Sequence, residues 1–157
     1  MTGEKIETID ELLRIAVDAN LEGLDFLSQF TREQLADGFN GIGPEFLPVA
    51  IRDKVSDFLH IFASAAVVHD LRNEFSDGTR AGFEAANAEF YHNCLKLADY
   101  HYGIFDRRRY RARAAALVLY AFVSAEWFGW RAWLEAKDRH AAKMASDNSV
   151  WKTKEEK

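Results

Sequence analysis

The sequence predicts an all-α fold, a single-domain helical bundle built around an antiparallel central helix pair, and three observations support this. Apolar residues recur at helical spacing over most of the 157 residues. No alternating strand pattern of useful length occurs. The polar segments between the periodic stretches are short, as is usual between helices that pack side by side. The composition, 48% hydrophobic and 29% charged, is that of an ordinary globular protein.

We expect one domain followed by a polar tail. The N-terminal helical segment covers 1–37, a Gly/Pro loop covers 38–48 and the core helices cover 52–145, so that the domain spans 1–147 and the tail spans 148–157.

Two capping boxes predict helix starts in the N-terminal segment. Thr8 stands three residues before Glu11, and Thr31 stands three residues before Gln34. In this pattern the hydroxyl accepts from a free amide while the later side chain reaches back to the cap. We therefore expect one helix to begin at Thr8 and a short helix or turn over 32–37.

The Gly/Pro loop contains three glycines within 38–43, followed by Pro44. Glycine permits positive φ, and proline biases the residue before it away from the helix. Such a loop exposes backbone groups, so Gly41 and Gly43 are candidates to hold a cation or an oxyanion.

The central helix pair is predicted over about 52–75 and 80–102. The turn between them, Ser76–Thr79, is rich in residues that favour turns and helix caps. Two helices joined by so short a turn must lie antiparallel and adjacent.

A distinctive run ends the first of these helices. Small and β-branched residues over 65–68 precede His69 and Asp70. These two polar side chains are costly to desolvate unless they are paired, hydrogen-bonded or bound to a metal. Neighbours on a helix diverge by about 100°, so His69 should bond across to the next helix, with Asn87 as its partner, and Asp70 should point toward the Gly/Pro loop.

The last helix, or pair of helices, is predicted over about 107–145. Trp127, Trp130 and Trp133 are spaced by three, which favours packing on one face, although an exposed interaction surface stays open. Core residues are expected at Phe58, Phe62, Phe83, Phe90, Leu117 and Trp130.

Arginines at the start of this segment have two interpretations. Arg107, Arg108 and Arg111 fall on one side at helical spacing, so they could bind phosphate, lipid headgroups or an acidic partner. The alternative is a solvated first turn paired with acidic residues of the same chain.

Charge and composition exclude several classes. The net charge of −5 argues against a general nucleic-acid binder, and a single cysteine, Cys94, allows no disulfide within the chain. No signal peptide is apparent, and the longest apolar stretch is too short for a transmembrane segment. We expect a soluble, cytoplasmic protein, and a homo-oligomer stays open.

The order of loop, dyad and partner helix resembles the calcium-dependent phospholipases A-two. Gly41-Ile-Gly43, the helix ending in His69-Asp70 and the helix carrying Asn87 match their glycine loop, His-Asp dyad and antiparallel partner helix. More closely, the chain resembles small helical proteins of phages and prophages. Those proteins share a Gly-x-Gly-Pro loop, the dyad and an ending like Phe128-Gly-Trp-Arg-Ala-Trp133.

The phospholipase resemblance implies a specific chemistry. Ca²⁺ would be held by Asp70, waters and the carbonyls of Gly41 and Gly43. His69 would act as general base on a water, and the residue at Asn87 would orient it. Asn87 stands where that family has an aspartate, so it would lack the charge that stabilises an imidazolium.

Two function hypotheses follow. In the first, the chain is a helical protein, related to phage or prophage proteins, whose His-Asp site is structural or degenerate. In the second, it is a calcium-dependent, phospholipase-like ester hydrolase. The sequence also offers two other candidate metal sites: a carboxylate-bridged site built on Glu89 and His92, and a surface site of His92, Asp99 and His101.

Overall fold

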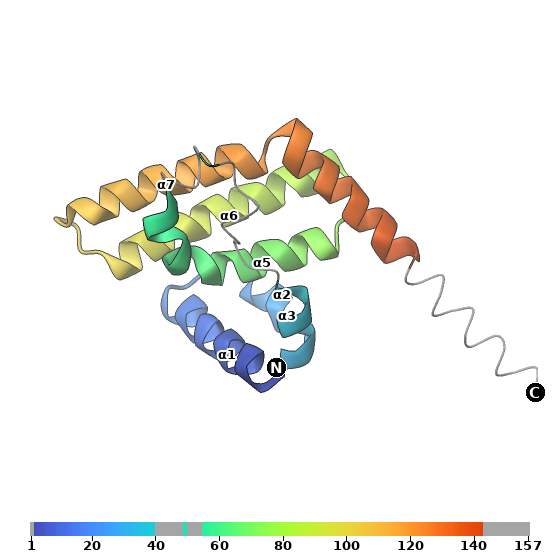
Figure 1. Cartoon of the computed structure of the whole chain (residues 1–157), viewed down its shortest axis with the longest axis horizontal. Coiled ribbons are helices and arrows are strands. Elements are labelled where there is room, and N and C mark those ends of the chain that lie inside the picture. Colours follow the sequence, from blue (N-terminus) through green and yellow to red (C-terminus); the bar gives the residue numbers. More distant parts are fainter. Residues whose placement is uncertain (1, 40–48, 50–54, 143–157) are drawn as a thin grey trace, which may run out of the picture.

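The computed structural model describes residues 2–39, 49 and 55–142, and every element in this part of the chain is helical (Figure 1). The all-α prediction is confirmed. In chain order, the elements are α1 (Thr2–Asp18), α2 (Leu24–Leu27), α3 (Arg32–Gly38), the 3₁₀ helix η2 (Ser56–Phe62), α5 (Ala63–Glu74), α6 (Arg80–His101), α7 (Arg107–Val123), the π-helical turn η3 (Glu126–Trp130) and a final helical stretch over 131–142.

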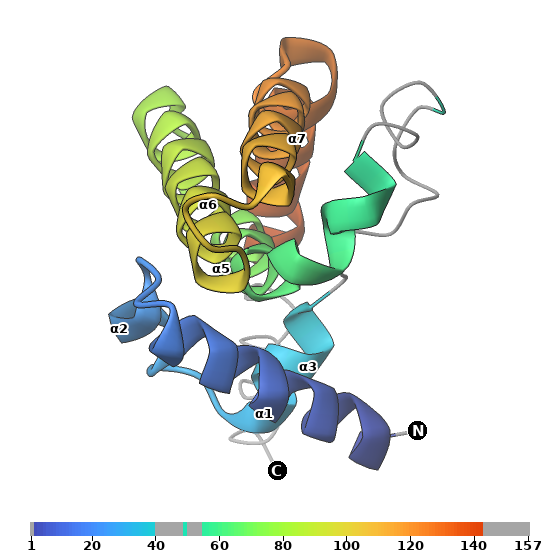
Figure 2. The same ribbon diagram turned by 90° about the vertical axis from the view of Figure 1, so that its left-hand side faces the viewer.

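Helix α5 lies between two layers of the bundle. On one side it contacts α1 and α3, and on the other it contacts α6 (Figure 2). The small and β-branched run explains this position: Ala65 belongs to the cluster shared with α6 and α7, whereas Val67 and Val68 belong to the cluster shared with α1 and α3. All three are fully buried, so α5 buries two faces at once.

The predicted antiparallel pair is present as α5 and α6, which lie side by side (Figure 1). Gly78 in the connection has a φ of +70°, a conformation that other residues rarely adopt. Thr79 then caps α6, its hydroxyl accepting from the Gly82 amide. The turn predicted over Ser76–Thr79 is therefore confirmed.

Two details of the predicted helices are wrong, and one is confirmed. Helix α1 begins at Thr2, so Thr8 lies inside it and does not start it. The stretch before the dyad is a 3₁₀ helix followed by α5, with a break at Phe62, instead of one continuous α-helix. The capping box at Thr31 is confirmed, with both of its hydrogen bonds formed.

Four of the six predicted core residues, the phenylalanines, are buried. Trp130 is only partly buried, and Leu117 is 53% exposed, which makes its assignment to the core wrong. The tryptophan stripe is split as well, because Trp133 is buried whereas Trp127 is exposed. A π-helical turn separates these residues, so α-helical spacing does not hold across it.

Among the described helices, none is both long enough and apolar enough to cross a membrane.

Candidate functional site

The site predicted at the end of the central helix is formed by α5 and α6. His69 Nε2 lies 3.0 Å from Asn87 Oδ1, which confirms the predicted contact between the two helices. Both residues sit near the turn that joins their helices, and antiparallel packing places them opposite each other.

The second ring nitrogen of His69 also has a partner. Asn73, one helical turn later on α5, places Nδ2 3.2 Å from His69 Nδ1 and 3.4 Å from His69 Nε2, and the same amide donates to the His69 carbonyl oxygen. The contact with Asn87 fits a neutral imidazole whose Nε2–H donates to Asn87 Oδ1, with the Asn73 amide close to both ring nitrogens. If Nδ1 were protonated, its N–H group would face the N–H donor of Asn73, and neither donor would have an acceptor in the other.

Apolar packing favours the same neutral form. The His69 ring lies against Phe90, with 4.7 Å between ring centroids, and Phe90 is buried. Burial lowers the pKa of His69, and the hydrogen bond to Asn87 and the charge of Glu89 only partly oppose this. Asn87 is itself buried, and its Nδ2 has no hydrogen-bond partner in the described part of the chain.

A second polar interaction between α5 and α6 lies near the His69–Asn87 contact and was not predicted. Arg72 donates to Glu89 through Nε (3.1 Å) and through a terminal nitrogen (3.0 Å), a bidentate arrangement. The guanidinium also stacks on Phe26, 4.0 Å from the ring centroid. From the sequence, Glu89 is only a metal-ligand candidate, because nothing in the sequence identifies a cross-helix partner for Arg72.

Asn93 was also missed by sequence reasoning. It is fully buried, accepts from the Glu22 amide and donates to the Glu22 carbonyl. This pairing fastens the connection after α1 to the middle of α6. A polar residue on the buried face of a helix was the only signal, and it does not reveal the partner.

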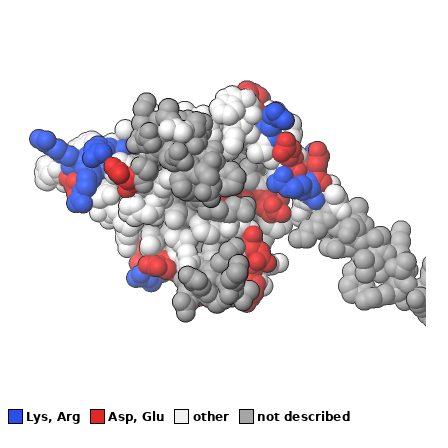
Figure 3. All heavy atoms as spheres, in the orientation of Figure 1, with Lys and Arg blue, Asp and Glu red and all other residues white. Residues whose placement is uncertain are grey.

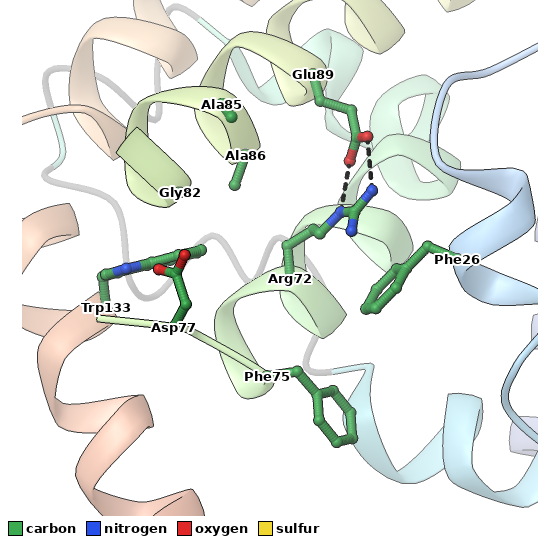
Figure 4. Close-up of a pocket in the computed structure, with 9 residues that line it drawn as sticks. All are labelled: Phe26, Arg72, Phe75, Asp77, Gly82, Ala85, Ala86, Glu89 and Trp133. Carbon is green, nitrogen blue, oxygen red and sulfur yellow. Dashed lines mark hydrogen bonds and ion pairs between the residues drawn. The ribbon is translucent and has the colours of Figure 1, made fainter. Parts of the chain in front are cut away.

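A cavity of about 290 Å³ borders the Arg72–Glu89 pair (Figure 4). Phe26, Phe75 and Trp133 supply aromatic walls, and His69 and Asn87 are not among the lining residues. Its charged groups are already engaged, because Arg72 binds Glu89, and Asp77 accepts two hydrogen bonds from Thr79.

Asp77, a carboxylate of this cavity, is not tuned to act as a general base. The pKa of Asp77 is lowered by the two Thr79 hydrogen bonds and, to a smaller degree, by the Trp133 indole, although Trp133 Nε1 makes no hydrogen bond of standard geometry. A general base at neutral pH needs the opposite shift. Asp77 is therefore poorly suited to act as a general base at neutral pH.

The predicted calcium ligands are described only in part. Asp70 follows His69 on α5 and is partly buried. Gly41 and Gly43 lie outside the described residues, so the predicted approach of Asp70 to their loop stays a prediction. Within the described residues, no group of three or more His, Cys, Asp or Glu side chains is arranged to hold a metal ion.

The two other metal-site candidates are occupied by ion pairs. Glu89 binds Arg72, and His92 lies 3.7 Å from Glu22. Asp99 binds Arg109 and Arg113, and chiefly the Arg109 hydrogen bond lowers the pKa of its carboxyl.

The predicted arginine patch lies at the turn between α6 and α7. Arg108 binds Asp106, the residue that caps α7, and Arg111 lies 3.4 Å from Asp57 of η2. Arg107 is exposed and makes no ion pair within the described residues. The chain's own carboxylates thus neutralise part of the patch, as expected if this is a solvated first turn paired with acidic residues of the same chain. Arg107 keeps an unpaired charge within the described residues.

Replacing His69 with glutamine should make the folded protein less sensitive to acid. Because the pKa of His69 in the folded state lies below its unfolded value of about 6.5, the unfolded chain binds more protons between these two values. The stability that His69 contributes is therefore full above about pH 6.5 and is lost as the pH falls toward the folded pKa. Glutamine keeps an Nε2 donor for Asn87 but does not titrate.

Denaturant unfolding at several pH values between about 5 and 8 measures this effect as the difference between the two proteins. The pKa of His101 is also lowered, by burial and by the charge of His60. Its contribution to the pH dependence is the same in both proteins, so it cancels in the difference. Identical pH slopes for wild type and His69→Gln would contradict the lowered pKa of His69 in the folded protein.

The comparisons with known proteins find no relative: no family model, no curated protein and no solved structure matches this chain.

Proposed function

We propose that this chain is a non-catalytic helical protein in which His69 and Asn87 hold α5 against α6, so that its phospholipase-like site is structural or degenerate. One observation carries this proposal: His69 Nε2 contacts Asn87, and the Asn73 amide lies within 3.4 Å of both ring nitrogens. A general base needs a nitrogen that is free to take a proton from water and an environment that tolerates the resulting charge.

The asparagines do not supply that environment. In a serine protease triad, replacing the orienting aspartate with asparagine lowers turnover about ten-thousand-fold, because the tautomer is wrong and the imidazolium loses its charge partner. Here Asn87 and Asn73 are both uncharged, and Phe90 covers the ring. The arrangement suits a structural link between helices.

The alternative is the calcium-dependent ester hydrolase, with His69 as general base and Asp70 as calcium ligand. Under our proposal, millimolar Ca²⁺ leaves the melting temperature unchanged for the wild type and for Asp70→Asn. A hydrolase would instead gain about 2.7 kcal/mol at a calcium concentration one hundred times its Kd, and the variant would not. Thermal melts with Ca²⁺ or Mg²⁺, combined with release of fatty acid from short-chain phosphatidylcholine, separate the two hypotheses.

Calcium-specific stabilisation that Asp70→Asn abolishes, or fatty-acid release that His69→Gln abolishes, would overturn the proposal. The relation to helical proteins of phages and prophages is proposed on two motifs alone, the Gly41–Pro44 loop and the Phe128–Trp133 segment.

We further propose that the arginine end of the molecule binds an anionic partner. Residues 99–113 contain five arginines and two aspartates, an excess of three positive charges in a chain whose net charge is −5. Arginine at the start of a helix is unfavourable toward the helix dipole, so this placement is not explained by the stability of α7. Arg107, exposed and outside the ion pairs described above, supports the proposal most directly.

A further inference from the structure

We propose that the turn between α6 and α7 docks on an anionic lipid surface, with Ile104 and Phe105 entering the boundary between headgroups and acyl chains. This inference rests on the anionic partner proposed above and specifies it. The docking tip consists of Ile104, Phe105, Arg107, Arg108, Tyr110 and Arg111.

The apex of the tip is apolar and unprotected. Phe105 is 94% exposed and Ile104 is 62% exposed, and the two are consecutive residues of the turn. Phe105 is the most exposed large apolar residue in the described part of the chain. A single exposed apolar residue is ordinary, but an adjacent pair at the end of a helical hairpin places both side chains where a bilayer could reach them together.

Tyrosines lie behind this apex. Tyr110 is exposed on the first turns of α7, and its hydroxyl donates to the Ile104 carbonyl oxygen, which fixes the ring beside the apex. Tyr100 is exposed near the end of α6. Tyrosine is enriched at membrane–water boundaries because its ring is apolar and its hydroxyl remains hydrated.

Arginines complete the tip. Arg107, Arg108 and Arg111 begin α7 directly after the apex, and Figure 3 shows basic side chains gathered at the end of the molecule where α6 turns into α7. Guanidinium groups bind phosphate oxygens with two hydrogen bonds. In the Arg108–Asp106 and Arg111–Asp57 pairs, Asp106 is partly buried and the other three side chains are exposed, so lipid phosphates can compete with these carboxylates for the arginines.

An apolar apex with tyrosines and arginines behind it favours a lipid surface over an acidic protein as the partner. An acidic protein would satisfy the arginines but would leave Ile104 and Phe105 without an apolar partner. A second copy of the chain is disfavoured, because two such tips would bring like charges together. A bilayer with anionic headgroups suits both the apolar apex and the arginines. The apolar side chains enter below the phosphates, while the arginines stay among the phosphates.

Sedimentation of the full chain with vesicles tests this inference. The chain should bind vesicles of equal parts phosphatidylcholine and phosphatidylglycerol, and should bind vesicles of phosphatidylcholine alone far more weakly. Phe105→Ser should weaken binding about tenfold or more, and each of Arg107→Gln and Arg108→Gln should weaken it about fivefold. A Phe105→Trp variant should show blue-shifted emission on the anionic vesicles but not with soluble polyphosphate.

Two exposed residues away from the tip provide matched controls. Leu117→Ser removes an exposed apolar side chain from α7, and Arg131→Gln removes an exposed arginine from the final helical stretch. Both should bind anionic vesicles like the wild type. Circular dichroism of each variant confirms that its helices are retained.

The outcomes separate the two proposals. Equal binding by Phe105→Ser and Leu117→Ser, or binding to polyphosphate without binding to vesicles, would overturn the lipid inference and keep the anionic partner. Binding to neither polyphosphate nor anionic vesicles would overturn both. Binding to neutral and anionic vesicles alike would overturn the role assigned to the arginines.

Discussion

Replacing Phe90 with alanine should lower the free energy of unfolding by about 3–5 kcal/mol. Phe90 is 3% exposed and belongs to the largest buried cluster, where α6 meets α5, α7 and η2. Truncation removes the apolar ring from this cluster and leaves a cavity among side chains that belong to different helices. It also removes the ring that covers His69.

Denaturant unfolding measures the loss, and Phe105→Ala is the matched control. Phe105 has the same side chain but is almost fully exposed, so its truncation should change the free energy of unfolding by less than about 0.5 kcal/mol. If Phe90→Ala costs less than about 1 kcal/mol, then Phe90 does not occupy the core position described here.

The removal of Phe90 should also have a local effect at the site. With the ring gone, more of the His69 imidazole, which is already partly exposed, meets water, and the burial that lowers its pKa is reduced. NMR titration of the imidazole should therefore show a higher pKa in Phe90→Ala than in the wild type.

The central helix pair could be predicted from sequence because its signals are local. The turn residues over Ser76–Thr79 define where α5 ends and α6 begins, and helical geometry then places Asn87 opposite His69. The periodicity of Phe83 and Phe90 likewise identifies the buried face of α6. None of these steps requires knowledge of how more distant segments pack.

Contacts between distant segments could not be predicted. The stacking of Phe26 on Arg72 depends on where the segment after α1 lies against α5, and the Asn93–Glu22 pairing depends on the same packing. Asn73 lies one helical turn from His69, but its side chain could reach several acceptors. The spacing in the sequence therefore does not identify its partner. The Gly41 and Gly43 part of the site stays a prediction, because it falls outside the described residues.

Leu117 illustrates how side-chain size can mislead. The sequence predicts this large residue in the core, yet α7 buries mainly alanines, Ala112, Ala115 and Ala116, against the bundle. Small residues let two helix backbones approach closely, and this close contact with α6 turns Leu117 toward solvent. Leu119 and Phe122 then fill the space nearer the end of α7.

The junction after α7 explains why a glycine, Gly129, stands in the Phe128–Trp133 segment. In the π-helical turn η3, the amides of Phe128, Gly129 and Trp130 all point at the Ala125 carbonyl, with N···O distances of 3.2, 2.8 and 3.3 Å. This widened turn presses Gly129 against the end of α7. A Cβ atom at Gly129 would lie 1.6 Å from the Val123 carbonyl oxygen.

Gly129→Ala should therefore destabilise the protein by about 3 kcal/mol or more. The atom that the methyl group meets belongs to the backbone, so a change of rotamer cannot relieve the overlap. Either α7 or the final helical stretch must shift, which would separate Trp130 and Trp133 from Phe83, whose ring centroid lies 5.3 and 6.0 Å from theirs. Denaturant unfolding gives the free energy, and near-ultraviolet circular dichroism reports the tryptophan packing.

Gly103→Ala provides the control for this last change. A Cβ atom at Gly103 would meet nothing within 4 Å, and the residue does not have a positive φ, so alanine fits without strain. Because alanine also restricts the unfolded chain, this variant should be neutral or up to about 1 kcal/mol more stable than the wild type. If Gly129→Ala were as stable as Gly103→Ala, the close approach of η3 to α7 would be wrong, and the glycine of this segment would need another explanation.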